Sequence, residues 1–159
     1  MNKFIQATAF AVLAFAAMAN ATASVKVTYA NPEKMTDVPR NKSDLDAMES
    51  ALTEHFARLA AQLPAGQDLK VDVLDIDLAG DVFPRVAVRD IRVYRDRADW
   101  PHMHLRFSIE QDGKVLRSGE RELSDAAYMM GGSRYGDEMF RFEKKMLDNW
   151  FRKELSATP

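Results

Sequence analysis

Hydrophobic residues recur with a helical period in two long stretches of the chain and with a period of two in several shorter ones. The first helical stretch begins at Ser43 or Asp44 and ends before Pro64, because serine is a good N-cap and proline stops a helix. Its apolar stripe consists of Leu45, Met48, Leu52, Phe56, Leu59 and Leu63.

The second stretch begins at Asp137 and ends near Leu155. Its apolar face carries Met139, Phe140, Phe142, Met146, Leu147, Trp150 and Phe151. Each stripe predicts an amphipathic helix that packs on a core.

The stretches with a period of two predict strands over residues 24–30, 69–78, 85–94, 102–111 and 114–123. Asp112 and Gly113 separate the last two strands, and this dipeptide between alternating runs is typical of a two-residue β-hairpin. Alternation breaks between Val73 and Leu74, which predicts either a bulge or a strand covered on both faces. The order β-α-β-β-β-β-α predicts an α+β fold in two layers, a mainly antiparallel sheet packed by two long helices.

The hairpin pattern also predicts a register. In a strict two-residue hairpin, two glutamates of the last strand would oppose apolar residues of the strand before it, and burying them there is costly. A bulge near Ser118-Gly119 would shift the pairing by one residue. It would then place Glu120 opposite Arg106 and Glu122 opposite His104. We therefore predict a bulge at that position.

The N-terminus has the layout of a secretory signal peptide. Lys3 precedes an apolar segment over residues 4–18, and the small residues Ala21 and Ala23 follow as a cleavage site. Ala19 and Ala21 offer a second cleavage frame. The segment is shorter than the roughly 20 residues that a membrane-spanning helix needs. We therefore predict a cleaved leader over residues 1–23, a single domain over 24–159, a periplasmic location and no membrane span after cleavage.

Composition excludes several classes of protein. The chain has 159 residues and no cysteine, which excludes disulfides, thiolate metal sites and cysteine nucleophiles. Its 22 basic and 24 acidic residues give a formal charge of −2, so nucleic acid is not an expected partner. The sequence has no P-loop, dinucleotide-binding fingerprint, H-E-x-x-H motif or nucleophile elbow. No tightly bound cofactor is predicted.

Several short motifs follow one another along residues 24–159. They are Leu63-Pro64-Ala65-Gly66-Gln67, Asp75-Ile76-Asp77-Leu78-Ala79-Gly80, Trp100-Pro101, the Asp112-Gly113 hairpin, the segment from Leu123 to Tyr128, and the segment from Glu143 to Trp150-Phe151. Together they resemble an exported bacterial family, the domain of unknown function 3016, over essentially this whole range. The resemblance implies a small exported protein of proteobacterial type. It implies no catalytic residues, because the family has no established activity.

The first candidate site is the segment His102-Met103-His104. Alternate residues of a strand point to the same side, so the two imidazoles would lie about 7 Å apart. With Glu122 opposite His104, they could hold a divalent metal such as Zn²⁺ or Cu²⁺. The alternative is a solvated outer face, on which Arg106 would weaken a cation site.

The second candidate is a ligand or anion surface. Asp75 and Asp77 form an acidic run at a strand end, where they could serve acid–base chemistry, bind Ca²⁺, or simply cap turns. Arg85, Arg89 and Arg92 belong to an arginine-rich segment that could bind an anion. Aspartates interleave with these arginines, which favours an exposed surface of mixed charge as the alternative.

The third candidate is the last helix. Trp150 and Phe151 add to a very apolar face, which could exceed what the core needs and pair with a second subunit or an envelope protein, although core packing is favoured. Three hypotheses of function follow. The first is a non-enzymatic binding or envelope-accessory protein. The alternatives are a metal-binding periplasmic protein that uses the His-x-His strand and a small hydrolase that uses the acidic strand end.

Overall fold

A four-stranded mixed sheet forms one layer of the molecule. The computed structural model describes residues 23–83, 91–95, 98–132 and 134–154. The strand order is β1-β2-β5-β6, and the bounds are Val25–Tyr29, Gln67–Asp77, His102–Gln111 and Lys114–Ser124. β1 runs parallel to β2, and the other neighbours are antiparallel. β1 and β2 can run parallel because the segment that connects them is a crossover that contains a helix.

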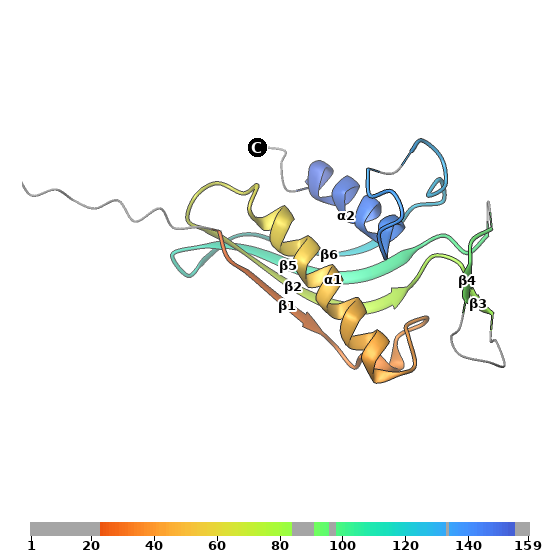
Figure 1. The fold of residues 1–159 in the computed structure, drawn as a ribbon. Coiled ribbons are helices and arrows are strands. Elements are labelled where there is room, and N and C mark those ends of the chain that lie inside the picture. Colours follow the sequence, from red (N-terminus) through yellow and green to blue (C-terminus); the bar gives the residue numbers. More distant parts are fainter. Residues whose placement is uncertain (1–22, 84–90, 96–97, 133, 155–159) are drawn as a thin grey trace, which may run out of the picture.

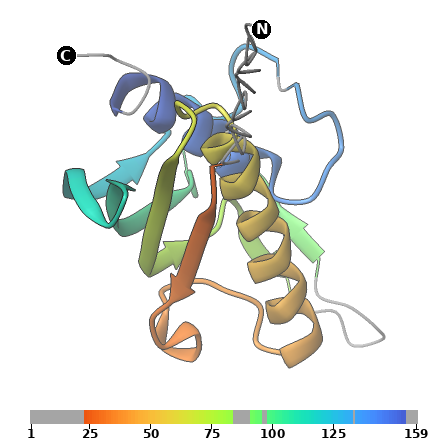
Figure 2. The same cartoon turned by 90° about the vertical axis from the view of Figure 1, so that its left-hand side faces the viewer.

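Two helices form the second layer. α1 (Lys42–Ala60) connects β1 to β2, and α2 (Arg141–Glu154) follows β6. Both helices lie on the same face of the sheet (Figure 1), and the view turned by 90° shows this face covered by them (Figure 2). The predicted α+β class and the predicted order of elements are therefore confirmed. None of the helices in the described ranges is long and apolar enough to cross a membrane.

The region between β2 and β5 differs from its prediction. β3 (Asp81–Phe83) and β4 (Ile91–Val93) pair with each other as a separate two-stranded sheet. The strand predicted over residues 85–94 is thus represented by β4, and residues 84–90 lie outside the described part of the chain. A short 3₁₀ helix, η1 (Pro32–Lys34), lies between β1 and α1.

The predicted register of the hairpin is correct, but its bulge lies elsewhere. Glu120 pairs with Arg106 and Glu122 with His104, as predicted. The extra residue is Leu116, because Ile109 pairs with Arg117 and Glu110 with Val115.

Gly119 has a different role from the predicted bulge. It lies opposite Phe107, and a Cβ at this position would stand 3.1 Å from Cε1 of that ring. The glycine therefore makes room for an aromatic neighbour, and the shift in register occurs nearer the turn. The irregularity predicted between Val73 and Leu74 is a bulge, which was one of its two predicted explanations.

The core lies between the sheet and the helices. It contains the apolar stripe of α1, the inner residues of β2 and β5, and Met146, Leu147, Trp150 and Phe151 of α2. Trp150 and Phe151 are only 4% and 3% exposed. The favoured expectation that these two side chains pack in the core is therefore confirmed, and the alternative of a partner surface is wrong, because the sheet and α1 already cover them.

Both helices begin at other residues than the sequence predicts. α1 begins at Lys42, because the Asn41 side chain accepts a hydrogen bond from the backbone N–H of Asp44 at 2.8 Å and acts as the N-cap. α2 begins at Arg141, four residues after the predicted start at Asp137. Phe140 precedes it with a positive φ of 57°, which is incompatible with a right-handed helix.

Candidate functional site

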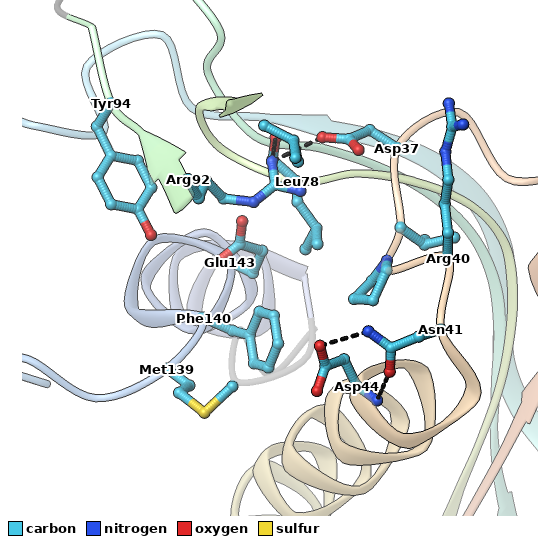
Figure 3. Close-up of a pocket in the computed structure, with 13 residues that line it drawn as sticks. Asp37, Arg40, Asn41, Asp44, Leu78, Arg92, Tyr94, Met139, Phe140 and Glu143 are labelled. Atoms are coloured by element: carbon cyan, nitrogen blue, oxygen red, sulfur yellow. Dashed lines mark hydrogen bonds and ion pairs between the residues drawn. The ribbon is translucent and has the colours of Figure 1, made fainter. Parts of the chain in front are cut away.

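A cavity of about 540 Å³ opens where the first turns of both helices meet the β3–β4 hairpin (Figure 3). The segment before α1, the end of β2 and the segment before α2 complete its wall. Its apolar lining consists of Val38, Pro39, Leu78, Val82, Tyr94, Met139 and Phe140. Its polar lining consists of Asp37, Arg40, Asn41, Asp44, Arg92 and Glu143. A pocket with an apolar wall and a few convergent polar groups is the usual form of a small-molecule site.

Glu143 is the most unusual residue of this cavity. It lies in the first turn of α2 and is only 3% exposed. Its Oε1 accepts a hydrogen bond from the backbone N–H of Ala79 at 2.8 Å. Burial raises the pKa of this carboxyl group, and the negative charge of Asp37 adds to that effect, while the Ala79 N–H and Arg92 oppose it. A buried acid with a raised pKa in a cavity is typical of functional sites.

Arg92 ties the hairpin to the rest of the wall. Its Nη1 donates to Oδ2 of Asp37 at 2.6 Å and to the carbonyl oxygen of Gly80 at 2.6 Å. The carbonyl oxygens of Leu78 and Ala79 lie 3.2 Å from the same nitrogen. This single guanidinium thus links β4, the end of β2 and the segment before α1, and it fixes the geometry of the cavity.

Phe140 projects into the cavity from a strained backbone position. A φ of 57° is rare for an aromatic residue, and such strain clusters at functional sites. The Phe140 carbonyl accepts a hydrogen bond from the Lys144 N–H at 2.9 Å, which begins the hydrogen bonding of α2. Figure 3 shows the ring facing the cavity, with Asp44 and Glu143 on either side of it.

Tyr94 forms the opposite wall. Its ring packs edge-on against Phe142 at 4.9 Å between centroids, and the Arg141 guanidinium lies 5.7 Å from the ring centre. Burial raises the pKa of the Tyr94 hydroxyl, and the charge of Glu143 raises it further. The hydroxyl therefore stays protonated at neutral pH and can donate a hydrogen bond into the cavity.

Residues 23–153 match the model of a family described as a protein of unknown function, DUF3016. The chain belongs to this family. No curated protein and no solved structure matches it. The resemblance drawn from the sequence motifs is therefore correct for the family. The cavity described above is a property of this DUF3016 chain that the family description does not mention.

The DUF3016 fold brings two of the predicted sites together on the outer face of the sheet. In the register of β2 and β5, Asp75 pairs with His104 and Asp77 with His102. The His104 imidazole, however, lies 2.8 Å from Oε1 of Glu120 rather than binding Glu122. Within the described ranges, no three His, Cys, Asp or Glu side chains are arranged to hold a metal ion.

The acidic strand end has structural roles of its own. Oδ1 and Oδ2 of Asp75 accept hydrogen bonds from the backbone N–H and the hydroxyl of Thr36, at 2.7 and 2.6 Å. Asp77 pairs with Asp37 in an isolated parallel bridge. Burial raises the pKa of Asp77, and His102 opposes this effect. Neither Asp75 nor Asp77 lines the cavity.

The predicted arginine surface is only partly within the described residues. Arg85 and Arg89 lie outside them, whereas Arg92 is part of the cavity wall. Sequence reasoning missed Glu143, although a signal for it existed. Glu143 precedes Met146, Leu147 and Trp150 by three, four and seven residues, so it falls on the apolar stripe of the last helix. A carboxylate in such a stripe needs a partner or a function.

Proposed function

We propose that this DUF3016 protein is a non-enzymatic binding protein of the bacterial envelope and that it holds a small amphipathic ligand in the cavity between α1, α2 and the β3–β4 hairpin. The observation that carries the proposal is the buried carboxyl group of Glu143 in a cavity with an apolar wall. Val82, Tyr94 and Met139 of this wall are 41%, 38% and 63% exposed. A ligand would cover these apolar side chains and give the buried acid a polar partner.

The two alternative functions have less support. A metal-binding role would use His102 and His104, but the imidazole of His104 already interacts with Glu120. A hydrolase at the acidic strand end would need Asp75 free to act, and Thr36 holds both of its carboxylate oxygens. The cavity is the site at which apolar surface, a buried acid and a strained aromatic residue coincide.

Filling the mouth of the cavity tests the proposal. The probe is the neutral dye N-phenyl-1-naphthylamine, whose fluorescence rises in an apolar site. We expect Val82→Trp to lower the affinity for this dye by at least about tenfold, because the indole would occupy the cavity. Val115→Trp is the matched control, since Val115 is 50% exposed at the tip of the β5–β6 hairpin. Equal binding of the dye by both variants would show that the cavity is not the site.

The envelope location has a structural correlate at the start of the domain. The backbone N–H and hydroxyl of Ser24 donate to Oδ1 of Asp68, at 3.1 and 2.6 Å. Cleavage after Ala23 would turn this N–H into an α-ammonium group within reach of the Asp68 carboxylate. The mature N-terminus would then begin β1 next to a charge of opposite sign, which supports processing at this bond.

Export is tested by expressing the whole chain in a Gram-negative host and measuring the intact mass of the periplasmic product. We expect a chain that begins at Ser24, because the small residues Ala21 and Ala23 fit the cleavage site. Ala23→Phe should prevent cleavage at that bond, and Ala19→Phe is the matched control, because Ala19 belongs to the second frame alone. Recovery of the uncleaved chain from the cytoplasm alone would refute the envelope assignment.

A further inference from the structure

The charges of the cavity do not balance. Asp37, Asp44 and Glu143 contribute carboxyl groups, and Arg40 and Arg92 contribute guanidinium groups. Asp37 and three backbone carbonyls already engage Arg92. Figure 3 shows the guanidinium of Arg40 directed away from the cavity. The groups left to meet a ligand are therefore acidic.

Neutral donors hold the two remaining carboxyl groups. Oδ2 of Asp44 accepts from the Asn41 amide at 2.6 Å, and Oε1 of Glu143 accepts from the Ala79 N–H at 2.8 Å. Both acids lie in the first turn of a helix, where their charge complements the positive end of the helix dipole. The carboxylates of Asp44 and Glu143 thus already occupy the positive ends of both helix dipoles. An anionic ligand would be repelled by these two negative charges.

Aromatic rings lie beside these carboxyl groups. Phe140 stands between Asp44 and Glu143 in Figure 3, and Tyr94 closes the other side. The face of an aromatic ring attracts an organic cation, most strongly where water is excluded. Phe140 holds this position with a positive φ of 57°. Val82 and Met139 add exposed apolar surface at the mouth of the cavity.

We propose that the ligand of this cavity is an organic cation, with an ammonium group placed among Asp44, Glu143 and the ring of Phe140 and an apolar body placed against Val82 and Met139. This inference rests on the proposed function and names its ligand class. Carboxylates and an aromatic face together select a quaternary or primary ammonium group over a sulfate or a carboxylate.

Binding of such a cation is linked to the proton of Glu143. The groups that face this carboxyl are Asp37 from the segment before α1, Arg92 from β4, the Tyr94 hydroxyl and the Ala79 N–H. Burial raises the pKa of Glu143, so at low pH the cation must displace a proton from it. The affinity for the cation should therefore fall as the pH falls, whereas that for a neutral ligand should not.

The test compares octyltrimethylammonium, 1-octanol and octyl sulfate as competitors of N-phenyl-1-naphthylamine, each below its micelle concentration. We expect the cation to bind at least about tenfold more tightly than the sulfate. Glu143→Gln and Asp44→Asn should each lower the affinity for the cation by about three- to tenfold. The affinity for 1-octanol should stay within about twofold of that of the unaltered chain. Asp46→Asn is the matched control, because it removes a charge two residues further along α1 and outside the cavity wall.

The outcomes separate this inference from the function on which it rests. If octyl sulfate competes as well as the cation, or if neither carboxylate variant changes the affinity for the cation, the proposed ligand class is wrong and the proposed binding function stands. If none of the three compounds displaces the dye and Val82→Trp binds it normally, the binding function itself has failed. The comparison of the three compounds on the unaltered chain decides the ligand class even where a variant folds poorly.

Discussion

Trp150→Ala should lower the free energy of unfolding by about 3–5 kcal/mol, which is the usual cost of removing a buried aromatic side chain. Trp150 is 4% exposed and connects three elements of the core. Its ring centroid lies 6.4 Å from that of Phe56 in α1 and 5.5 Å from that of Phe107 in β5, both in edge-on geometry. Since small domains have about 5–15 kcal/mol of stability, the variant would be only marginally folded.

Urea unfolding followed by circular dichroism measures this loss. Trp150→Phe is the first control, because it keeps an aromatic ring and removes an indole N–H that has no hydrogen-bond partner among the described residues. We expect this control to cost less than about 1.5 kcal/mol. Leu116→Ala, at an exposed bulge, should change stability by no more than about 0.5 kcal/mol. A small loss for Trp150→Ala would mean that α2 does not anchor the core.

The alternation of apolar and polar residues was sufficient to predict the four strands of the larger sheet, but not the separate pairing of β3 with β4. Because each strand has a buried and an exposed face, the cost of burying two glutamates fixed the register of the hairpin. The same argument could not locate the bulge, since an extra residue anywhere between the turn and Glu120 produces that register. The bulge at Leu116 leaves Gly119 opposite Phe107, and such a contact between strands is not contained in the pattern of a single strand.

The last helix shows a second limit of prediction from the sequence, because its pattern suggested a surface where the structure has core. Its pattern is more apolar than an average helix in a two-layer fold needs, and this excess suggested a partner surface at Trp150 and Phe151. The structure uses both side chains in the core, and the ring of Trp150 packs against Phe56 of α1 and Phe107 of β5. How many elements meet at one face is a property of the tertiary arrangement and is not readable from the helix itself.

The cavity was beyond prediction for a related reason. Its wall comes from segments at residues 37–44, 78–82, 92–94 and 139–143, which meet only after both helices have docked on the sheet. The sequence marks Glu143 as an acid within an apolar stripe, but it does not reveal the backbone N–H of Ala79 that donates a hydrogen bond to this carboxylate. The neighbourhood of Asp75, Asp77 and the two histidines was also beyond prediction, because it arises from the pairing of β2 with β5, which are far apart in the sequence.

A second buried polar cluster fastens the segment before α2 to both helices. The side chain of Asp148 is 6% exposed, and its Oδ1 lies 3.2 Å from Nε2 of the equally buried His55 of α1. Its Oδ2 accepts hydrogen bonds from the Tyr135 hydroxyl at 2.6 Å and from Arg134 at 3.0 and 2.5 Å. These donors satisfy the hydrogen-bonding capacity of a carboxylate that is almost fully removed from water.

Asp148→Ala should lower the free energy of unfolding by about 3 kcal/mol, because it removes the buried acceptor that holds Tyr135 and Arg134 and leaves the buried His55 without its partner. Urea unfolding at pH 8 measures the loss. Asp125→Ala is a control of the same chemistry, since Asp125 lies 3.8 Å from Lys145 in a looser pair and should cost about 1 kcal/mol or less. Equal losses for the two variants would contradict a special role for the Asp148 cluster.

The same cluster predicts how stability depends on pH. Burial lowers the pKa of His55 below its ordinary value, and the charge of Asp148 opposes this shift. As the pH falls below about 6.5, His55 becomes protonated in the unfolded chain but stays neutral in the folded chain. The free energy of unfolding therefore falls by up to about 1.4 kcal/mol per pH unit. Without Asp148 the pKa of folded His55 is lower still, and the loss in Asp148→Ala should extend further into acid. His55→Leu should remove this part of the acid loss altogether, and an unchanged pH profile in His55→Leu would show that another group is responsible.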